Sequence, residues 1–166
     1  MKSSLLRAAA IGSICVLSTL VARADDDERG RGAARTPLLP AYQSECSSCH
    51  IAYPPGLLPA ASWQRLMAHL PRHFGTDASL DAATAKLIDA WLQAHAADAA
   101  RPGRGAVVTP PPEDRITRSP WFVREHHEVT PAAWTRASVK SPSNCAACHT
   151  RADQGDFSER HVRIPR

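Results

Sequence analysis

Two short segments constrain this chain of 166 residues more than any other feature of its sequence. Residues 46–50 read Cys-Ser-Ser-Cys-His, and residues 145–149 read Cys-Ala-Ala-Cys-His. The chain has five cysteines, and all except Cys15 lie in these two segments. In each segment two thiols stand one helical turn apart, and a histidine follows the second thiol directly. This spacing is typical of the covalent attachment of a c-type haem.

The chemistry of attachment explains the spacing. Two thiols on one helical turn can add to the two vinyl groups of one haem, and the adjacent histidine then directs its imidazole at the iron. The sequence therefore predicts two haem c groups held by thioether bonds. The predicted residues are Cys46, Cys49 and the iron ligand His50 for the first haem, and Cys145, Cys148 and the iron ligand His149 for the second.

The same four cysteines could instead form two disulfides or one zinc site. A single zinc ion would require the two cysteine pairs to meet although they lie far apart in the sequence. Zinc ribbons usually have their two cysteine pairs closer together in the sequence. Both alternatives leave the positions of His50 and His149 unexplained. We therefore favour haem attachment.

The first 24 residues have the features of an export signal. Lys2 and Arg7 accompany an apolar stretch over residues 8–22, which is short for a membrane span. Ala24 closes a site suited to cleavage, and an acidic run follows it at residues 25–28. We expect cleavage near Ala24 and a periplasmic protein that is not an integral membrane protein. The alternative is an uncleaved anchor.

Charge and composition narrow the class of protein. The chain has 20 Lys and Arg residues against 16 Asp and Glu residues, a formal net charge of +4. Lys2, Arg7 and Arg23 precede the cleavage site, so the mature chain is nearly neutral, and four haem propionates would make it mildly acidic. No binding to nucleic acid is indicated. Aromatic residues make up only 5% of the chain, so a core without haem is expected to be thin.

Apolar periodicity predicts a mainly α fold without strands of useful length. A short helix is expected to begin at Ser62, to be disrupted by Pro71 and to end at Gly75. The clearest helical pattern runs over residues 80–97. A further helix is expected to start at Pro131, because proline is favoured in a first turn.

A Pro- and Gly-rich break at residues 101–112 predicts a boundary between two small haem-binding units. We expect a signal peptide over residues 1–24, an N-terminal haem unit over residues 25–103 and a C-terminal haem unit over residues 104–166. Pro-rich segments are expected to form stiff loops around the haems.

Each iron also needs a ligand on its distal side, and a single methionine in the mature chain cannot serve two haems. The candidates are Met67, His69, His73, His95, His126, His127 and His161. Met67 lies on the apolar stripe of its helix, so core packing is its expected role.

For the first haem, His73 lies close to the apolar face of its helix, and Pro71 allows the chain to turn back. His95 and His69 are the competing candidates. For the second haem, His126 and His127 are adjacent and both follow the apolar pair Trp121-Phe122, and His161 is a third option. The local pattern does not separate His126 from His127.

Longer strings resemble the dihaem cytochrome c family, often called DHC, over nearly the whole mature chain, and they are far more specific than C-x-x-C-H alone. Around the first motif they are Glu45 with residues 46–50, Ile51-Ala52-Tyr53-Pro54-Pro55, Ser62-Trp63 and His73-Phe74-Gly75. Around the second they are Trp121-Phe122 before His126, Val139-Lys140-Ser141, Asn144 with residues 145–149, Gly155-Asp156-Phe157 and Arg163-Ile164-Pro165.

The resemblance implies that both haems have two histidine ligands, with His73 and His126 on the distal sides. It implies an N-terminal unit like a small cytochrome c and a distinct C-terminal unit. It also implies an electron-transfer protein rather than an enzyme, which receives electrons from a membrane b-type cytochrome and donates them to a small monohaem c-type cytochrome. The alternative is a dihaem enzyme, or a redox or ligand sensor, in which one iron can open.

Overall fold

The computed structural model describes residues 37–99 and 108–166, which belong to one compact unit. The predicted signal peptide and its cleavage site lie outside the described residues, and so does the predicted boundary between residues 103 and 104. The division into two haem units therefore stays a prediction.

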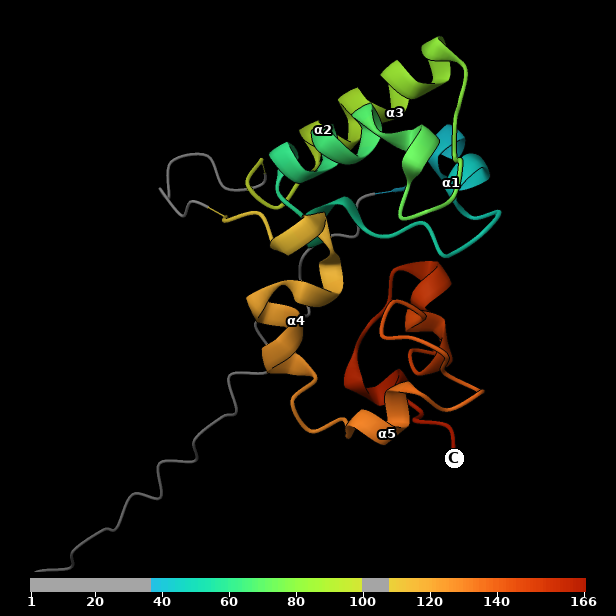
Figure 1. Cartoon of the computed structure of the whole chain (residues 1–166), viewed down its shortest axis with the longest axis vertical. Coiled ribbons are helices and arrows are strands. Elements are labelled where there is room, and N and C mark those ends of the chain that lie inside the picture. The colour runs from blue at the N-terminus through green and yellow to red at the C-terminus, as the bar shows by residue number, and fades with distance from the viewer. Residues whose placement is uncertain (1–36, 100–107) are drawn as a thin grey trace, which may run out of the picture. The chain divides into compact units, whose positions relative to one another are not determined.

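Five α-helices and several 3₁₀ turns make up the described part of the chain, which contains isolated β-bridges but no β-strand (Figure 1). The predicted mainly α fold is confirmed. No helix within residues 37–99 or 108–166 is long and apolar enough to cross a membrane. The α-helices are α1 (Pro40–Cys46), α2 (Ala60–Ala68), α3 (Ala82–Ala94), α4 (Pro120–Glu125) and α5 (Pro131–Trp134). The 3₁₀ turns are Pro55–Leu57, Leu70–Arg72, Pro112–Asp114, Ile116–Arg118, Cys145–Ala147, Ala152–Gln154 and Glu159–His161.

The helices begin where the sequence supplies a suitable first turn. Pro40, Pro120 and Pro131 stand at the starts of α1, α4 and α5, where the missing N–H has no helical partner to lose. Helix α3 follows Asp81, whose carboxylate accepts hydrogen bonds of 3.0 Å from the backbone N–H groups two and three residues later. The predicted helix start at Pro131 is confirmed.

The helix predicted over residues 62–75 is shorter than expected. Helix α2 ends at Ala68, and Pro71 lies in the 3₁₀ turn that follows it. The chain then reverses at Phe74 and Gly75, where φ is +50° and +96°. Glycine adopts this left-handed conformation freely, whereas phenylalanine is strained in it. His73 lies between the 3₁₀ turn and this reversal.

The hydrophobic core of the described residues lies in the range 37–99. Helices α2 and α3 pack against each other (Figure 1). The Nε1–H of Trp63 donates to the backbone carbonyl of Pro55 at 2.7 Å and so fixes part of the Pro-rich segment against α2. Met67 packs against the core, as its position on the stripe predicts. The buried core residues are Tyr42, Ala52, Leu58, Trp63, Ile88, Leu92 and Ala96.

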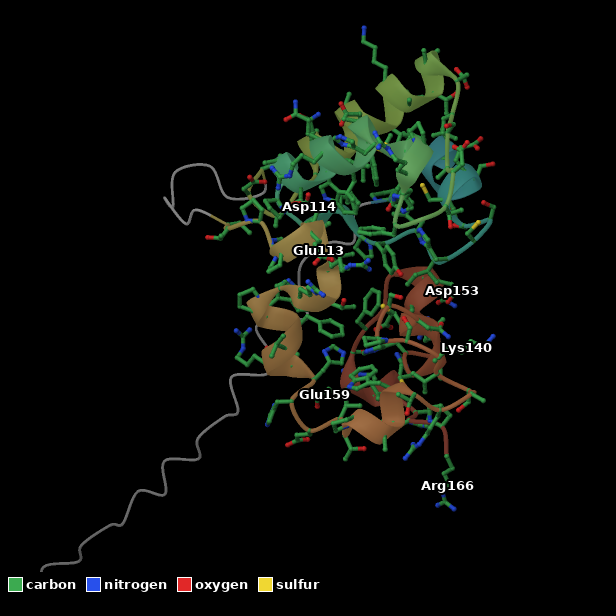
Figure 2. The ribbon with its side chains drawn as sticks, in the orientation of Figure 1. Glu113, Asp114, Lys140, Asp153, Glu159 and Arg166 are labelled. Carbon is green, nitrogen blue, oxygen red and sulfur yellow. The ribbon has the colours of Figure 1, made fainter. Side chains whose placement is uncertain are left out.

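An ion pair joins α2 to the 3₁₀ turn Pro112–Asp114. The guanidinium of Arg65 donates to both carboxylate oxygens of Asp114, at 2.9 and 2.6 Å. Figure 2 shows Asp114 next to Glu113 on the segment that leads towards α4. This contact ties the two described ranges together across 49 residues of sequence.

Residues 108–166 have little hydrophobic core of their own. The buried hydrophobic side chains there are Phe122, Ala133, Val139 and Ala152. Backbone contacts hold the C-terminal tail instead: His149 forms a bridge with Val162, and the N–H of Arg163 donates to the carbonyl of Cys148 at 2.8 Å. A haem attached in this range would supply apolar surface that the chain lacks.

Candidate haem sites

The two C-x-x-C-H segments adopt the same local turn. The N–H of His50 donates to the carbonyl of Cys46 at 3.5 Å, and the N–H of His149 donates to the carbonyl of Cys145 at 2.8 Å. The first segment continues from the end of α1, and the second begins with the 3₁₀ turn Cys145–Ala147. One helical turn places residues three and four apart on the same side of the backbone. Both thiols and the imidazole of each segment can therefore face one cofactor.

No disulfide joins the four cysteines of the two motifs. Burial raises the pKa of Cys46 to about 11, with a further contribution from the charge of Glu45. Burial also raises the pKa of Cys145 to about 11. Within residues 37–99 and 108–166, no three His, Cys, Asp or Glu side chains are grouped to hold a metal ion, so the geometry does not support one shared zinc site.

The first site pairs His50 with His73. Their ring centroids lie 6.2 Å apart, and the ring planes differ by 29°. The Nδ1–H of His50 donates to the backbone carbonyl of Ile51 at 2.7 Å, which leaves Nε2 for a metal ion. Tyr53 stacks on the His50 ring at 4.7 Å with an interplanar angle of 19°. The His50 ring is thus held by a hydrogen bond and an aromatic neighbour.

The second site pairs His126 with His149. Their ring centroids lie 6.1 Å apart, and the ring planes differ by 70°. The Nδ1–H of His126 donates to the backbone carbonyl of Phe122 at 2.9 Å. The rings of His126 and Phe122 also stack, with their centroids 4.0 Å apart. The ring of Phe157 contacts His149 edge-on at 5.3 Å. In this site the distal candidate carries the orienting hydrogen bond.

Both separations fit one metal ion held between two imidazoles. A metal–nitrogen bond to histidine is about 2 Å long. On each side of the metal, the distance from the bound nitrogen to the centre of its ring adds to this bond, so the two ring centres should lie roughly 6 Å apart. The two pairs, at 6.2 and 6.1 Å, meet this requirement.

The electrostatics of both sites favour neutral imidazole, the form that binds a metal ion. Burial lowers the pKa of His73, and the charge of His50 lowers it further. Burial likewise lowers the pKa of His149, with a second contribution from His126 that the Phe157 backbone partly offsets. The Nδ1 atom of His73 is buried without a hydrogen-bond partner.

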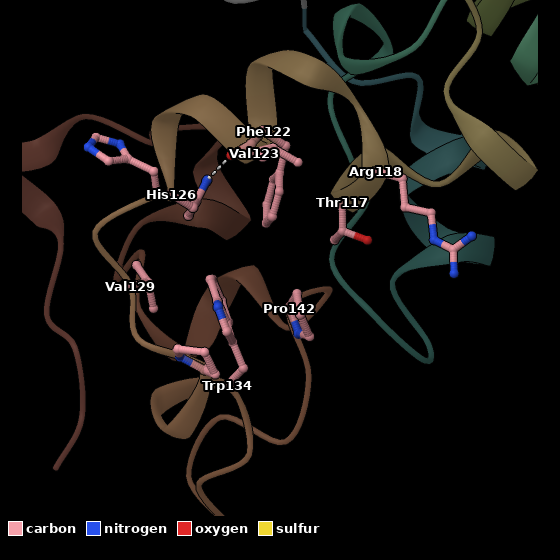
Figure 3. Close-up of a pocket in the computed structure, with 10 residues that line it drawn as sticks. Thr117, Arg118, Phe122, Val123, His126, Val129, Trp134 and Pro142 are labelled. Atoms are coloured by element: carbon pink, nitrogen blue, oxygen red, sulfur yellow. Dashed lines mark hydrogen bonds between the residues drawn. The ribbon is translucent and has the colours of Figure 1, made fainter.

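A cavity borders the distal candidate of each pair, while His50 and His149 are not among the lining residues. The cavity beside His126 has a volume of about 520 Å³, and the rings of Phe122 and Trp134 face it (Figure 3). The cavity beside His73 has a volume of about 420 Å³, and Leu66 and Phe74 are among its lining residues. Both volumes lie within the range of roughly 300–1,000 Å³ that is usual for cofactor sites.

The structure brings His73 and His126 to the histidines that the sequence predicts as their partners. In the described residues, the rings in contact with His50 are those of Tyr53 and His73. The rings in contact with His149 are those of His126 and Phe157. The ligand roles themselves stay predictions.

The competing candidates make contacts of their own, although His69 also lines the cavity beside His73 and His127 also lines the cavity beside His126. His69 and His127 are exposed, and each donates from Nδ1 to a backbone carbonyl of its preceding turn. His95 packs on Trp91 with the ring centroids 5.0 Å apart. The Nδ1 of His161 pairs with the buried carboxylate of Asp156 at 3.0 Å, an interaction that helps to fasten the C-terminal tail.

Sequence reasoning gave no role to Tyr53, Trp134 or Phe157 as neighbours of the ligands. The structure places Tyr53 on His50, Trp134 5.9 Å from His126, and Phe157 on His149. Tyr53 follows His50 by only three residues, and this spacing is the one local signal that could have pointed to it.

The attachment motifs and the paired histidines define a c-type haem protein with two haem sites, and the comparisons with known proteins agree. The profile of the family described as dihaem cytochrome c, DHC, matches residues 42–157. This chain belongs to the dihaem cytochrome c family, as its sequence predicts. Membership confirms the prediction of two covalently bound haem c groups, and members of this family are generally electron carriers.

Solved structures of the family resemble the whole described unit. The diheme cytochrome c from Rhodobacter sphaeroides is 51% identical, with a TM-score of 0.65, over 75% of this chain and 100% of that one. A second structure, of DHC purified from Rhodobacter sphaeroides, is 47% identical with a TM-score of 0.62, and the match covers 74% of this chain and 99% of that one. The diheme cytochrome type c from Shewanella baltica OS155 is 37% identical with a TM-score of 0.66, and the match covers 78% of this chain and 95% of that one. No curated protein matches the chain.

Proposed function

We propose that this protein is a periplasmic electron carrier in which each haem iron has two histidine ligands. His50 and His73 bind the first iron, and His149 and His126 bind the second. The observation that carries the proposal is the separation of about 6 Å between the rings of each pair, next to a C-x-x-C-H motif in both cases. The bound haem supplies a reversible one-electron step, and the chain supplies ligands, orientation and burial.

Two-sided ligation favours electron transfer over catalysis, because a reaction at the iron requires an open position. A ring separation near 6 Å accommodates one iron and leaves no space for an additional ligand between the rings. Two histidine ligands also give a lower reduction potential than a histidine and a methionine. The protein is therefore expected to work as a low-potential carrier.

As partners we propose a membrane b-type cytochrome as donor and a small monohaem c-type cytochrome as acceptor. This pairing is what the sequence resemblance implies, and exposed apolar side chains beside both sites are suited to contact with small redox partners. Phe74 packs against His73 and is 46% exposed, and Val123 lines the cavity of His126 and is 59% exposed. Small surfaces of mixed polarity suit the brief contacts of electron carriers.

Optical spectra of both oxidation states, with and without carbon monoxide, test the proposal. We expect low-spin bands that carbon monoxide does not change. A high-spin band, or a shift caused by carbon monoxide, would show an open iron and favour an enzyme or a sensor. Intact mass spectrometry of protein exported through the haem maturation machinery should give a chain that starts near Asp25 and carries two haem masses.

A further inference from the structure

Tyr53 contacts the proximal histidine of the first haem site and the loop that leads into the second attachment motif. Its ring stacks on the imidazole of His50, which belongs to the first site. Its phenol donates a hydrogen bond of 2.7 Å to the backbone carbonyl of Ser143, 90 residues further along the chain. The same carbonyl accepts a hydrogen bond of 3.0 Å from the N–H of Cys145, an attachment residue of the second site. One side chain and one carbonyl thus connect the proximal ligand of one haem to the attachment loop of the other.

Both ends of this connection are anchored. The phenol of the buried Tyr42 donates to the backbone carbonyl of Tyr53 at 2.8 Å. The loop that carries Ser143 is held by the side chain of Asn144, which donates to the carbonyl of the buried Val139 at 3.0 Å. A change at Tyr53 can therefore be transmitted to the second site, since neither end is free to absorb it.

The Tyr53 phenol keeps its proton under ordinary conditions. Burial raises the pKa of Tyr53 to about 12, and the nearby Cys145 adds to this effect.

We propose that Tyr53 is a shared positioning residue, which fixes the plane of the His50 imidazole through its ring and fixes the attachment loop of the second haem through its hydroxyl. The hydroxyl and the ring of Tyr53 act on different residues, so substitutions can distinguish their effects. Tyr53→Phe removes the hydrogen bond to Ser143 and keeps the stacking on His50. Tyr53→Leu removes both.

Two spectroscopic readouts on the oxidised holoprotein test the two tasks. Proton NMR gives the paramagnetically shifted methyl resonances of each haem, and low-temperature electron paramagnetic resonance (EPR) reports the orientation of the axial ligand planes. Tyr53→Phe should shift the methyl resonances of the second haem and leave the EPR signal of the first haem unchanged. Tyr53→Leu should change that EPR signal as well. Ser79→Ala is the control, because it removes a hydroxyl that donates to Asp77 and makes no contact with Tyr53 or Ser143 in the hydrogen bonds described.

The outcomes separate the explanations. If Tyr53→Phe leaves the second-haem resonances in place, or if Ser79→Ala shifts them equally, Tyr53 does not position the second site. If Tyr53→Leu leaves the first EPR signal unchanged, the ring does not fix His50. The inference rests on the ligand set proposed above, and the wild-type spectrum tests that set independently. High-spin wild-type haem would refute the ligand set, whereas low-spin wild-type haem with unresponsive Tyr53 variants would refute only the role of Tyr53.

Discussion

The imidazole planes of His126 and His149 cross at 70°. Those of His50 and His73 cross at only 29°. Packing explains the difference, because the carbonyl and ring of Phe122 hold His126 while Phe157 contacts His149 edge-on. The two haems should therefore differ electronically although both have the same kind of ligands.

We expect two distinct low-spin ferric signals in the EPR spectrum of the oxidised protein. Crossed ligand planes leave two iron d orbitals nearly equal in energy, so the second haem should give the more anisotropic signal. Nearly parallel planes separate these orbitals, and the first haem should give an ordinary rhombic signal. Two identical signals would contradict the geometry of one pair.

Replacing a distal histidine by glycine should open one haem and leave the other closed. His73→Gly should make the first haem high-spin, allow it to bind carbon monoxide and raise its reduction potential. His126→Gly should do the same to the second haem and abolish the more anisotropic signal. Optical titration with carbon monoxide should give one binding site per protein in each variant.

The matched controls are the neighbouring histidines. His69→Gly and His127→Gly remove exposed rings that contact neither His50 nor His149, so both haems should stay low-spin. If His127→Gly opened a haem and His126→Gly did not, the second distal ligand would be His127. If neither variant opened the second haem, His161 would be the next candidate.

Loss of the second haem should unfold its surroundings more than loss of a single packing contact would. The double substitution Cys145→Ala and Cys148→Ala removes both thioether bonds in a range with few buried hydrophobic side chains. Residues 108–166 should then become sensitive to protease, because local opening costs little free energy without the haem. Resistance to limited proteolysis equal to that of the wild type would show that the chain packs without haem.

Gly75→Ala should destabilise the turn that presents His73. Gly75 has a φ of +96°, and no atom lies within 4 Å of an added Cβ, so the cost comes from the backbone alone. Alanine in this conformation should lower the free energy of unfolding by about 1 kcal/mol and give a fraction of high-spin first haem. Gly56→Ala is the control, since its surroundings are equally open and its φ is not positive. Denaturant unfolding and optical spectra of both variants check this.

In acid, the free energy of unfolding of the protein should depend on pH, because Asp114 becomes protonated there. The hydrogen bond from the Arg65 guanidinium holds the pKa of Asp114 below its usual value. A lowered folded-state pKa stabilises the protein above the unfolded-state value of about 3.9, and this contribution is lost as the pH falls through the folded-state value. Because Arg65 is half exposed, Asp114→Asn should cost at most about 1 kcal/mol at neutral pH. In thermal unfolding, the difference from the wild type should shrink below pH 4, and a constant difference would contradict the ion pair.

The sequence by itself determined the class of cofactor and most of the helical structure. C-x-x-C-H needs only one turn of chain to bring its three functional side chains together, so the motif is meaningful without tertiary contacts. The same holds for helix starts at prolines such as Pro131 and for the apolar stripe of α3, whose signals lie within a few neighbouring residues.

Only the tertiary structure decided which histidines meet. His73 follows His50 by 23 residues and His126 precedes His149 by 23, and no periodic pattern links positions so far apart. The reversal at Phe74 and Gly75 places His73, and the final turn of α4 separates His126 from its exposed neighbour His127. The contact between Tyr53 and Ser143 likewise arises only from the tertiary structure. Contacts between distant segments depend on the packing of the whole unit, and local sequence does not encode that directly.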